Sequence, residues 1–343
     1  MHPLRFPPER PRTDDRPIWD LLFGIYGYPA VLVAHDLKLF PLLGAKPRTL
    51  EEICEALRIH PRPAEALLTV CLALGLVQRE GGRYTLTPIA EDYLLESSPT
   101  YFGGFLDSTI SNYSLWSFES LKKAVLTNAP QVYGGRDMFQ SHEEEARLAR
   151  SFTRAMHSAS MGPALAWPEL IDLSEHHTLL DVGGGSGAHA IGAALRWEHL
   201  DAIVLELPRV CEVAREFAAA YGLEARIRTV EADMWKDPFP PADLHFYSMI
   251  YHDWPPERCR FLSKKSYETL APGGRIILHE MLLNDEKTGP FAVAAFNIDM
   301  LLWDRGQQYS GPELSLMLTE AGFSDIEVRS TFGYWSVVTG RKA

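Results

Sequence analysis

The sequence predicts an α/β fold: a mostly parallel sheet that ends in an antiparallel hairpin, preceded by a mainly helical N-terminal domain. From Thr178 onward, short apolar runs alternate with helical segments, a pattern typical of parallel strands covered by helices. The last two runs, DIEVRST and YWSVVTGRK, are joined by a tight connection and must therefore pair antiparallel. Before residue 100, three helical segments precede a short hairpin, which is the element order of a winged helix.

The N-terminal helices have recognisable ends. YPAVLVAHDLKLFPLLG is expected to form one apolar helix that ends at Gly44, and the next helix, TLEEICEALRI, begins with a capping box of Thr49 and Glu52. PAEALLTVCLALG ends at Gly75, and LVQREGGRYTLTP has two extended halves joined by glycines. The third helix is apolar where a DNA-reading helix would be basic, so it suits packing against another subunit.

Changes in composition divide the chain into four expected parts. They are a flexible, proline-rich arm at 1–17, a winged-helix-like dimerisation domain at 18–100, a helical connector at 101–170 with SLKKAVL and EEEARLARSFTRAMHSAS, and the sheet domain at 171–343. The arm lacks the apolar stretch of a secretion signal, and no run of about 18 apolar residues is evident. These features predict a cytoplasmic protein.

Charge and cysteine content exclude several classes of partner. The chain has 45 acidic and 33 basic residues, for a net charge of -12. This charge repels nucleic acid and anionic membrane surfaces, so neither is an expected partner. The 4 cysteines are far apart and form no C-x-x-C, and the histidines and acids do not cluster at ligand spacing. We therefore expect no metal site and no disulfide framework.

A glycine-rich segment, LLDVGGGSG, follows the first predicted strand of the sheet. Gly183 and Gly185 lack Cβ atoms, so a ligand can approach the main chain there, although the spacing alone also fits a dinucleotide. Glu206 ends the second strand about twenty residues later, where a carboxylate can accept both ribose hydroxyls. Asp233 and Met234 follow the third strand, where they can hold an adenine. S-adenosylmethionine, an adenosine cofactor without phosphate, can use both acids.

Seven features occur in a family-specific order: the winged-helix domain, FTRAMHSAS, LLDVGGGSG, VLELP, EADMW, YHDW and APGGRIILHE. With them the chain from about residue 20 to residue 343 resembles the small-molecule O-methyltransferases of the plant caffeate, acetylserotonin and bacterial natural-product type. The resemblance implies a Rossmann-like class I methyltransferase sheet, a homodimer through interlocked N-terminal domains, and S-adenosylmethionine as cofactor, with S-adenosylhomocysteine as product. The expected cofactor residues are Ser160, Asp181, Gly183, Gly185, Glu206, Leu207, Asp233, Met234 and Ser248.

His252, in YHDW after the fourth predicted strand, is the candidate general base. A phenol has a pKa near 10, whereas an ordinary histidine near 6.5 is mostly free to take its proton at neutral pH. Glu280, at the end of the next strand, is expected to fix the tautomer of His252 and to stabilise its imidazolium form. Asp253 is expected to cap the following helix. Gln308 stands where the family carries a second acid, so it is expected to orient the ring without offsetting charge.

Apolar and aromatic side chains at helical spacing mark the walls of an acceptor site. The expected acceptor residues are Trp116, Phe152, Met156, Asn297, Met300 and Trp303, and the expected acceptor is a small aromatic hydroxyl compound. Because the second acid is replaced, methylation of carbon or nitrogen stays open. A nicotinamide oxidoreductase and a winged-helix regulator are more distant alternatives.

Overall fold

The computed structural model describes residues 10–132 and 146–343, and the chain divides into two compact units, Met1–Pro99 and Thr100–Ala343. The first unit contains α1 (Arg16–Asp36), α2 (Leu39–Ala45), α3 (Leu50–Leu57), α4 (Pro61–Ala73), β1 (Val77–Glu80), β2 (Arg83–Leu86) and α5 (Pro88–Leu94). The strands β1 and β2 pair antiparallel, as the sequence predicts. The predicted arm at 1–17 lies mostly outside the described residues.

The capping box of α3 is confirmed: the Glu52 N–H donates to Thr49 Oγ1 at 3.3 Å, and the Thr49 N–H donates to Glu52 Oε2 at 2.9 Å. The prediction of a single helix that ends at Gly44 is wrong. The helix stops at Asp36 and α2 begins at Leu39, because Lys38 adopts a left-handed conformation with φ 63° that a continuous helix cannot contain.

Helix α1 leaves a row of apolar side chains exposed. They are Ile18, Trp19, Leu21, Leu22, Phe23, Ile25 and Tyr26. Within residues 10–132 and 146–343, α1 is the one helix that is long and apolar enough to cross a bilayer by length and composition. Asp20 interrupts its apolar run, and an exposed apolar helix face is also what a subunit interface presents.

The second unit begins with helices and continues as a sheet with covering helices. In order it contains α6 (Gly103–Asn112), η1 (Tyr113–Trp116), α7 (Phe118–Thr127), α9 (Ala146–Leu170), β3 (Thr178–Val182), α10 (Ala188–Arg196), β4 (Asp201–Glu206), α11 (Pro208–Ala220), β5 (Ile227–Glu231), β6 (Leu244–Ser248), η3 (Tyr251–Asp253), α12 (Pro256–Thr269), β7 (Arg275–Met281), α13 (Phe291–Trp303), α14 (Gly311–Ala321), β8 (Ser324–Phe332) and β9 (Trp335–Arg341). Helix α9 corresponds to the predicted EEEARLARSFTRAMHSAS helix. Residues 143–145 of that segment lie outside the described residues.

The sheet has the strand order β5-β4-β3-β6-β7-β9-β8. Strands β3 to β7 pair in parallel, and the terminal pair β8 and β9 is antiparallel, so the predicted sheet is confirmed. The chain runs outward from β3 to β5 and then returns to place β6 on the other side of β3. Connections therefore leave β3 and β6 in opposite directions, and such a switch point is where open α/β sheets bind ligands.

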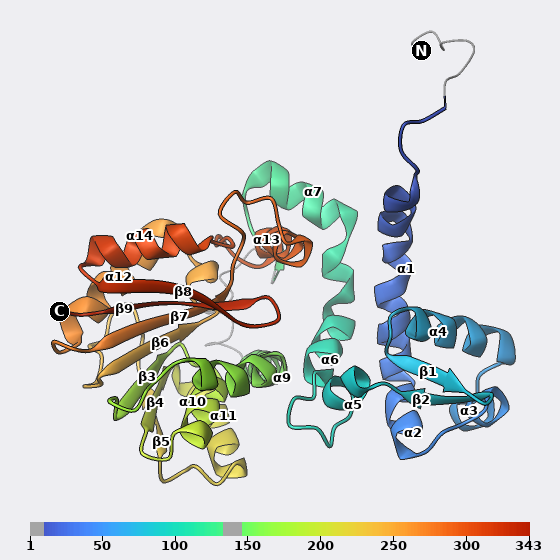
Figure 1. Cartoon of the computed structure of the whole chain (residues 1–343), viewed down its shortest axis with the longest axis horizontal. Coiled ribbons are helices and arrows are strands. Elements are labelled where there is room, and N and C mark those ends of the chain that lie inside the picture. The colour runs from blue at the N-terminus through green and yellow to red at the C-terminus, as the bar shows by residue number, and fades with distance from the viewer. Residues whose placement is uncertain (1–9, 133–145) are drawn as a thin grey trace. The chain divides into compact units, whose positions relative to one another are not determined.

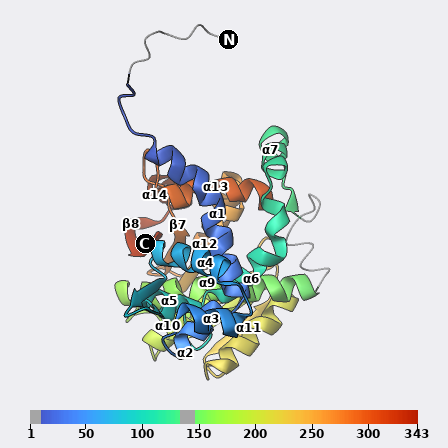
Figure 2. The same ribbon diagram turned by 90° about the vertical axis from the view of Figure 1, so that its right-hand side faces the viewer.

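Both faces of the sheet are buried at its central strands β3, β4 and β6, which explains why these strands are mostly apolar. Along β3 and β4, alternate residues face opposite layers: Leu179 and Val204 pack with α9, α10 and α11, whereas Leu180 and Ile203 pack with α12 and α14. Figures 1 and 2 show these two groups of helices on opposite faces of the sheet. A sheet held between two layers presents its strand ends as a rigid platform for a site.

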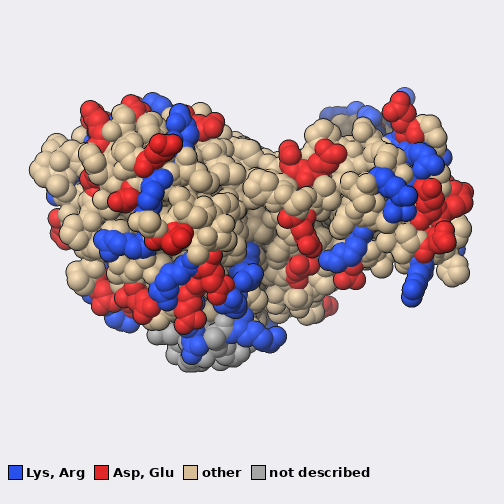
Figure 3. Space-filling view, turned by 90° about the horizontal axis from the view of Figure 1, so that it is seen from below, with Lys and Arg blue, Asp and Glu red and all other residues tan. Residues whose placement is uncertain are grey.

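The surface charges are mixed by sign. On the face seen in Figure 3, lysine and arginine side chains lie beside aspartate and glutamate side chains, with broad uncharged stretches between them. That face does not gather basic residues into a continuous patch of the kind that tracks a phosphate backbone.

Candidate functional site

The glycine loop after β3 is built for close approach. Gly183 has φ 65°, and a Cβ atom there would lie 2.5 Å from Cδ1 of Ile250 and 3.9 Å from Sδ of Met234. Gly185 has φ 56°, a conformation that favours glycine. A Cβ at Gly184 would lie 2.5 Å from Cγ of the Asp181 carboxylate. A side chain is therefore disfavoured for a different reason at each of the three glycines. The contact of Gly183 with Ile250 also joins the loop to the segment that follows β6.

Glu206 holds the loop from the end of β4. Its Oε1 accepts the Gly185 N–H at 3.3 Å, and its Oε2 accepts the Leu207 N–H at 2.7 Å. Burial raises the pKa of Glu206 to about 7, although both N–H groups favour the carboxylate. Burial also raises the pKa of Asp181 to about 7, against a hydrogen bond from the Ala190 backbone. Two enclosed carboxyl groups thus flank the glycine loop.

These residues fit an adenosine cofactor. Each carboxylate oxygen of Glu206 takes one backbone N–H and keeps further acceptor capacity, so the pair can receive two vicinal hydroxyls. Met234 lies beside Gly183, where an apolar side chain can cover a flat ring. Asp233 has partners of its own: Oδ1 accepts the Trp235 N–H at 2.8 Å, and Oδ2 lies 2.7 Å from Lys236 Nζ.

The other predicted cofactor residues differ in how closely the structure ties them to this loop. Ser248 ends β6, where its Oγ lies 3.2 Å from Nδ1 of His279 on the neighbouring strand. Leu207 contributes the backbone N–H that binds Glu206. Ser160 lies on α9, partly buried, one turn beyond His157, whose Nδ1 is 2.8 Å from Oγ of Ser186 in the glycine loop.

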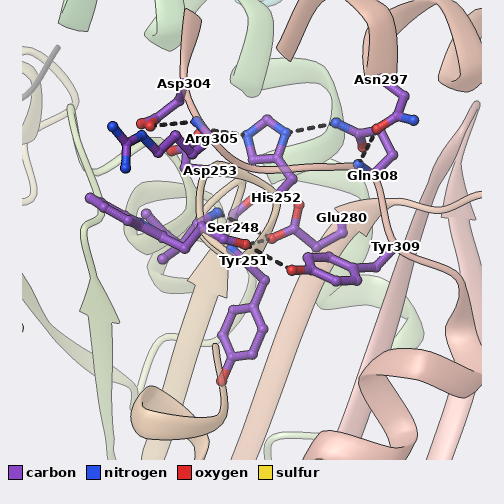
Figure 4. A network of polar contacts seen from close by, with 12 residues as sticks. Ser248, Tyr251, His252, Asp253, Glu280, Asn297, Asp304, Arg305, Gln308 and Tyr309 are labelled. Atoms are coloured by element: carbon purple, nitrogen blue, oxygen red, sulfur yellow. Dashed lines mark hydrogen bonds and ion pairs between the residues drawn. The ribbon is translucent and has the colours of Figure 1, made fainter. Parts of the chain in front are cut away.

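His252 is held at both ring nitrogens. Its Nδ1 lies 2.8 Å from Nε2 of Gln308, and its Nε2 lies 3.2 Å from Oδ1 of Asp253 (Figure 4). Burial lowers the pKa of His252 to about 3, although a hydrogen bond with the Met249 backbone favours protonation. The main chain of Gln308 is itself held, because its backbone N–H donates to Oδ1 of Asn297 at 2.7 Å. The ring is neutral and rigidly oriented.

The expected role of Glu280 is corrected by the structure. Its Oε1 accepts the backbone N–H groups of Ile250 at 3.1 Å and Tyr251 at 2.9 Å, so it orients the main chain that leads to His252 and not the imidazole ring. The segment that enters the short η3 turn places these backbone N–H groups next to Glu280 at the end of β7, so they and not the imidazole ring contact its Oε1. Burial raises the pKa of Glu280 to about 8, opposed by these N–H groups.

The prediction that Asp253 caps the next helix is wrong. Helix α12 begins at Pro256 with Pro255 as its cap and no side-chain cap bond. Asp253 instead ends the η3 turn, which directs its carboxyl group back to Nε2 of His252. Burial raises the pKa of Asp253 well above its ordinary value, with Asp304 and Glu280 adding repulsion.

Gly306 is a site residue that the sequence analysis did not single out. A Cβ there would overlap the carbonyl oxygen of His252 and the backbone of Asp253. The segment before Gln308 can therefore pass close behind the His252 backbone only because residue 306 is glycine. In the sequence, only its place in GQQYS, two residues before Gln308, indicates that Gly306 belongs to the site.

The predicted acceptor residues lie on η1, α9 and α13. Phe296 on α13 has its ring centre 5.3 Å from that of His252. Trp303 lies at the end of the same helix, with ring centres 6.1 Å from Trp116 and 6.4 Å from Phe152. Met300 is buried, and Met156 is partly buried on α9. The structure thus joins Trp116, Phe152 and Trp303 in one aromatic group.

Comparison with known proteins assigns the chain to a family. Residues 118–324 match the O-methyltransferase domain, and residues 19–96 match the O-methyltransferase dimerisation domain. The chain belongs to this O-methyltransferase family. The domain match spans most of the sheet unit, and the second match spans the N-terminal unit, as the resemblance implies.

Individual relatives cover nearly the whole chain. The 3-hydroxy-5-methyl-1-naphthoate 3-O-methyltransferase of Streptomyces sahachiroi is 36% identical over 330 residues, 94% of each protein. The tetracenomycin polyketide synthesis 8-O-methyltransferase of Streptomyces glaucescens is 29% identical, over 95% of this chain and 96% of that protein. The crystal structure of human N-acetylserotonin methyltransferase in complex with S-adenosylmethionine matches with a TM-score of 0.83 and 26% identity, over 98% of this chain and 100% of that one.

Proposed function

We propose that this protein binds S-adenosylmethionine and methylates a hydroxyl group of a small aromatic acceptor, with His252 as general base. One observation carries the proposal. The Gly183 position of the cofactor loop lies against Ile250, two residues before His252, so loop and base meet at the switch point of the sheet. The O-methyltransferase family match and the aromatic hydroxyl acceptor named for the S. sahachiroi relative support the same reaction.

When bound, the cofactor supplies an electrophilic methyl group on a sulfonium. Glu206 would accept the ribose hydroxyls, and its hydrogen bonds from the Gly185 and Leu207 backbone N–H groups keep its carboxylate in place. Gly183, whose Cβ position is occupied by Ile250 with Met234 beside it, keeps the loop backbone close to the segment that follows β6. Asp233 and Met234 would hold the adenine, and Ser160, Asp181, Leu207 and Ser248 would complete the cofactor site.

His252 takes the proton of the acceptor hydroxyl at Nε2, where the hydroxyl replaces the Asp253 contact. This step requires the proton of the neutral ring to be on Nδ1, and the Gln308 amide can accept it through Oε1 after a half-turn of its side chain. Asp253, as its carboxylate, then stabilises the imidazolium, and the imidazolium in turn favours that ionised form. Glu280 keeps the main chain of this turn in position.

The remaining assignments follow the same division of the chain. Residues 18–100 form the dimerisation domain of a homodimer, with the exposed apolar face of α1 as part of the interface. Residues 101–170 contribute to the acceptor wall, and 171–343 bind the cofactor. The protein acts in the cytoplasm on a small molecule.

Calorimetry with S-adenosylmethionine and S-adenosylhomocysteine, followed by transfer of labelled methyl to hydroxynaphthoates, naphthols and hydroxyindoles, tests the proposal. Binding of both ligands and a product methylated on oxygen, located by NMR, are expected. Lack of binding at millimolar concentration by folded protein would refute it. A product methylated on carbon or nitrogen would support the cofactor assignment but change the acceptor atom from oxygen. A shift in the thermal midpoint with NAD but not with S-adenosylmethionine would indicate an oxidoreductase.

A further inference from the structure

Helix α13 carries one ionisable residue in an otherwise uncharged sequence, FAVAAFNIDMLLW. That residue, Asp299, is held by aromatic side chains. The Trp116 indole N–H donates to Asp299 Oδ1 at 2.5 Å, and the Trp303 indole also hydrogen-bonds this carboxylate. Burial raises the pKa of Asp299, and these two indoles oppose that shift.

The two indoles at Asp299 and the Phe152 ring beside Trp303 come from three separate parts of the chain. Trp116 ends η1, Phe152 lies on α9, and Trp303 ends α13. The ring centre of Trp303 is 6.1 Å from that of Trp116 and 6.4 Å from that of Phe152. We call Trp116, Phe152 and Trp303, together with the Asp299 carboxylate, the aromatic cage.

Among the described residues, no cation compensates the charge of the cage. Within residues 10–132 and 146–343, no lysine, arginine or histidine stabilises Asp299, and its stabilising partners are the two neutral indoles. A partly buried carboxylate without a cation carries a desolvation cost that a cation would offset. Aromatic faces attract cations, and an ammonium group between such faces and a carboxylate gains from both. The cage therefore has the chemistry of a cation site.

The cage lies on the same side of α13 as the proposed base. Phe296, Asp299 and Trp303 are at positions i, i+3 and i+7, which share one helix face. The Phe296 ring packs against the His252 ring at 5.3 Å between centres. At 1.5 Å of rise per residue, Asp299 lies about 4.5 Å farther along the helix axis than Phe296. That offset is about the width of one aromatic ring.

We propose that the aromatic cage binds a positively charged amino group of the acceptor, so that the substrate class is an aromatic hydroxyl compound with an alkylammonium substituent. This inference rests on the proposed methyltransferase function. The hydroxyl faces His252 while the ammonium lies against the Asp299 carboxylate, beside the rings of Trp116 and Trp303. The two contacts together orient the ring and select the hydroxyl that is methylated.

The test compares two acceptors of nearly equal size, a naphthol with an aminomethyl group and the same naphthol with a hydroxymethyl group. We expect wild-type kcat/KM to be at least about tenfold higher for the ammonium compound, equivalent to roughly 1.4 kcal/mol. In Asp299→Asn, which keeps one oxygen for the Trp116 indole, the preference should disappear through a higher KM for the ammonium compound. The neutral compound should keep its kcat/KM.

Asp285→Asn is the matched control, because it removes the same charge from an exposed residue ahead of α13 and should leave the preference intact. Equal or better use of the neutral compound by wild-type protein would overturn the inference without any variant. Equal loss for both compounds in Asp299→Asn would assign the carboxylate a structural role and overturn it too. Failure to bind the cofactor or to methylate either compound would instead count against the proposed function.

Discussion

The amide Nε2 of Gln308 lies 2.8 Å from Nδ1 of His252, and both side chains are buried. An amide can donate to Nδ1 or accept from it, whereas a carboxylate can only accept. Gln308 therefore suits either neutral tautomer of His252 and adds no charge. In this site, the acidic group near the ring is Asp253 at Nε2 and not the residue at position 308.

Gln308→Glu should restrict His252 to the tautomer with the proton on Nδ1 and should raise its pKa from the value of about 3 that burial produces. Because a base with a higher pKa is protonated at higher pH, the acidic fall of kcat/KM should move to higher pH. A pH profile of kcat/KM measures this. Gln308→Leu, which removes the hydrogen bond at similar size, should lower kcat without such a movement, and coincident profiles for all three proteins would contradict the assignment.

His252→Ala should keep the cofactor and lose catalysis. The loss in kcat should be roughly 10²- to 10⁴-fold, the usual contribution of a general base. The dissociation constant for S-adenosylmethionine should stay within about twofold, since the glycine loop and Glu206 are untouched. Calorimetry and initial rates on one preparation measure both quantities. Full activity on a phenolic acceptor would remove His252 from the proposed role.

Cofactor binding should be linked to a proton at Glu206. Burial raises the pKa of Glu206 to about 7, and two ribose hydroxyls require the ionised form. Below that pH, binding must release a proton, so affinity should fall by up to about tenfold per pH unit. Calorimetry at pH 7 in buffers of different ionisation enthalpy counts the released proton. Glu206→Gln should bind more weakly and lose this pH dependence, which separates Glu206 from nearby Asp181.

Much of the sheet was predictable because apolar runs and connections follow simple geometry. The same logic placed Glu206 and His252 at strand ends beside the glycine loop. The contacts of Glu280 and Asp253 were not predictable, because they depend on a three-residue turn, Tyr251–Asp253. Strand order brings Glu280 next to that turn, but only the turn decides whether its carboxylate meets backbone N–H groups or the ring.

The acceptor side was less predictable still. Residues Trp116, Phe152 and Trp303 come from three segments whose packing no local pattern encodes, and spacing along α13 could not show that two indoles converge on Asp299. The break at Lys38 was missed for a related reason, since a lysine with positive φ has no sequence signal comparable to glycine.

Gly306→Ala should impair catalysis more than cofactor binding. The added methyl group would overlap the His252 carbonyl and the Asp253 backbone, and backbone atoms cannot move aside as a side chain can. We expect a fall in kcat of at least about tenfold, since small misplacements of a catalytic group are costly. Unchanged kcat in Gly306→Ala would show that the segment can shift to accommodate the methyl group without displacing His252, and would contradict the prediction.

His157 should make the folded protein sensitive to acid. Its Nδ1 lies 2.8 Å from Ser186 Oγ, and its ring stacks on Phe217 with centres 3.5 Å apart. Burial, with Arg154 nearby, lowers the pKa of His157 from 6.5 to about 4. The unfolded chain therefore binds the extra proton between these values, so this contribution to stability is complete above pH 6.5 and is lost as the pH falls toward 4.

Because the raised pKa values of Asp181, Glu206 and Glu280 act in the opposite direction on acidification, the test is a difference between proteins. Denaturant unfolding at pH 7.5 and pH 5 should show His157→Gln less stable than wild type at the higher pH, with the gap narrowing by about 2 kcal/mol at the lower one. A constant gap for His157→Gln would mean that the ring is not buried uncharged.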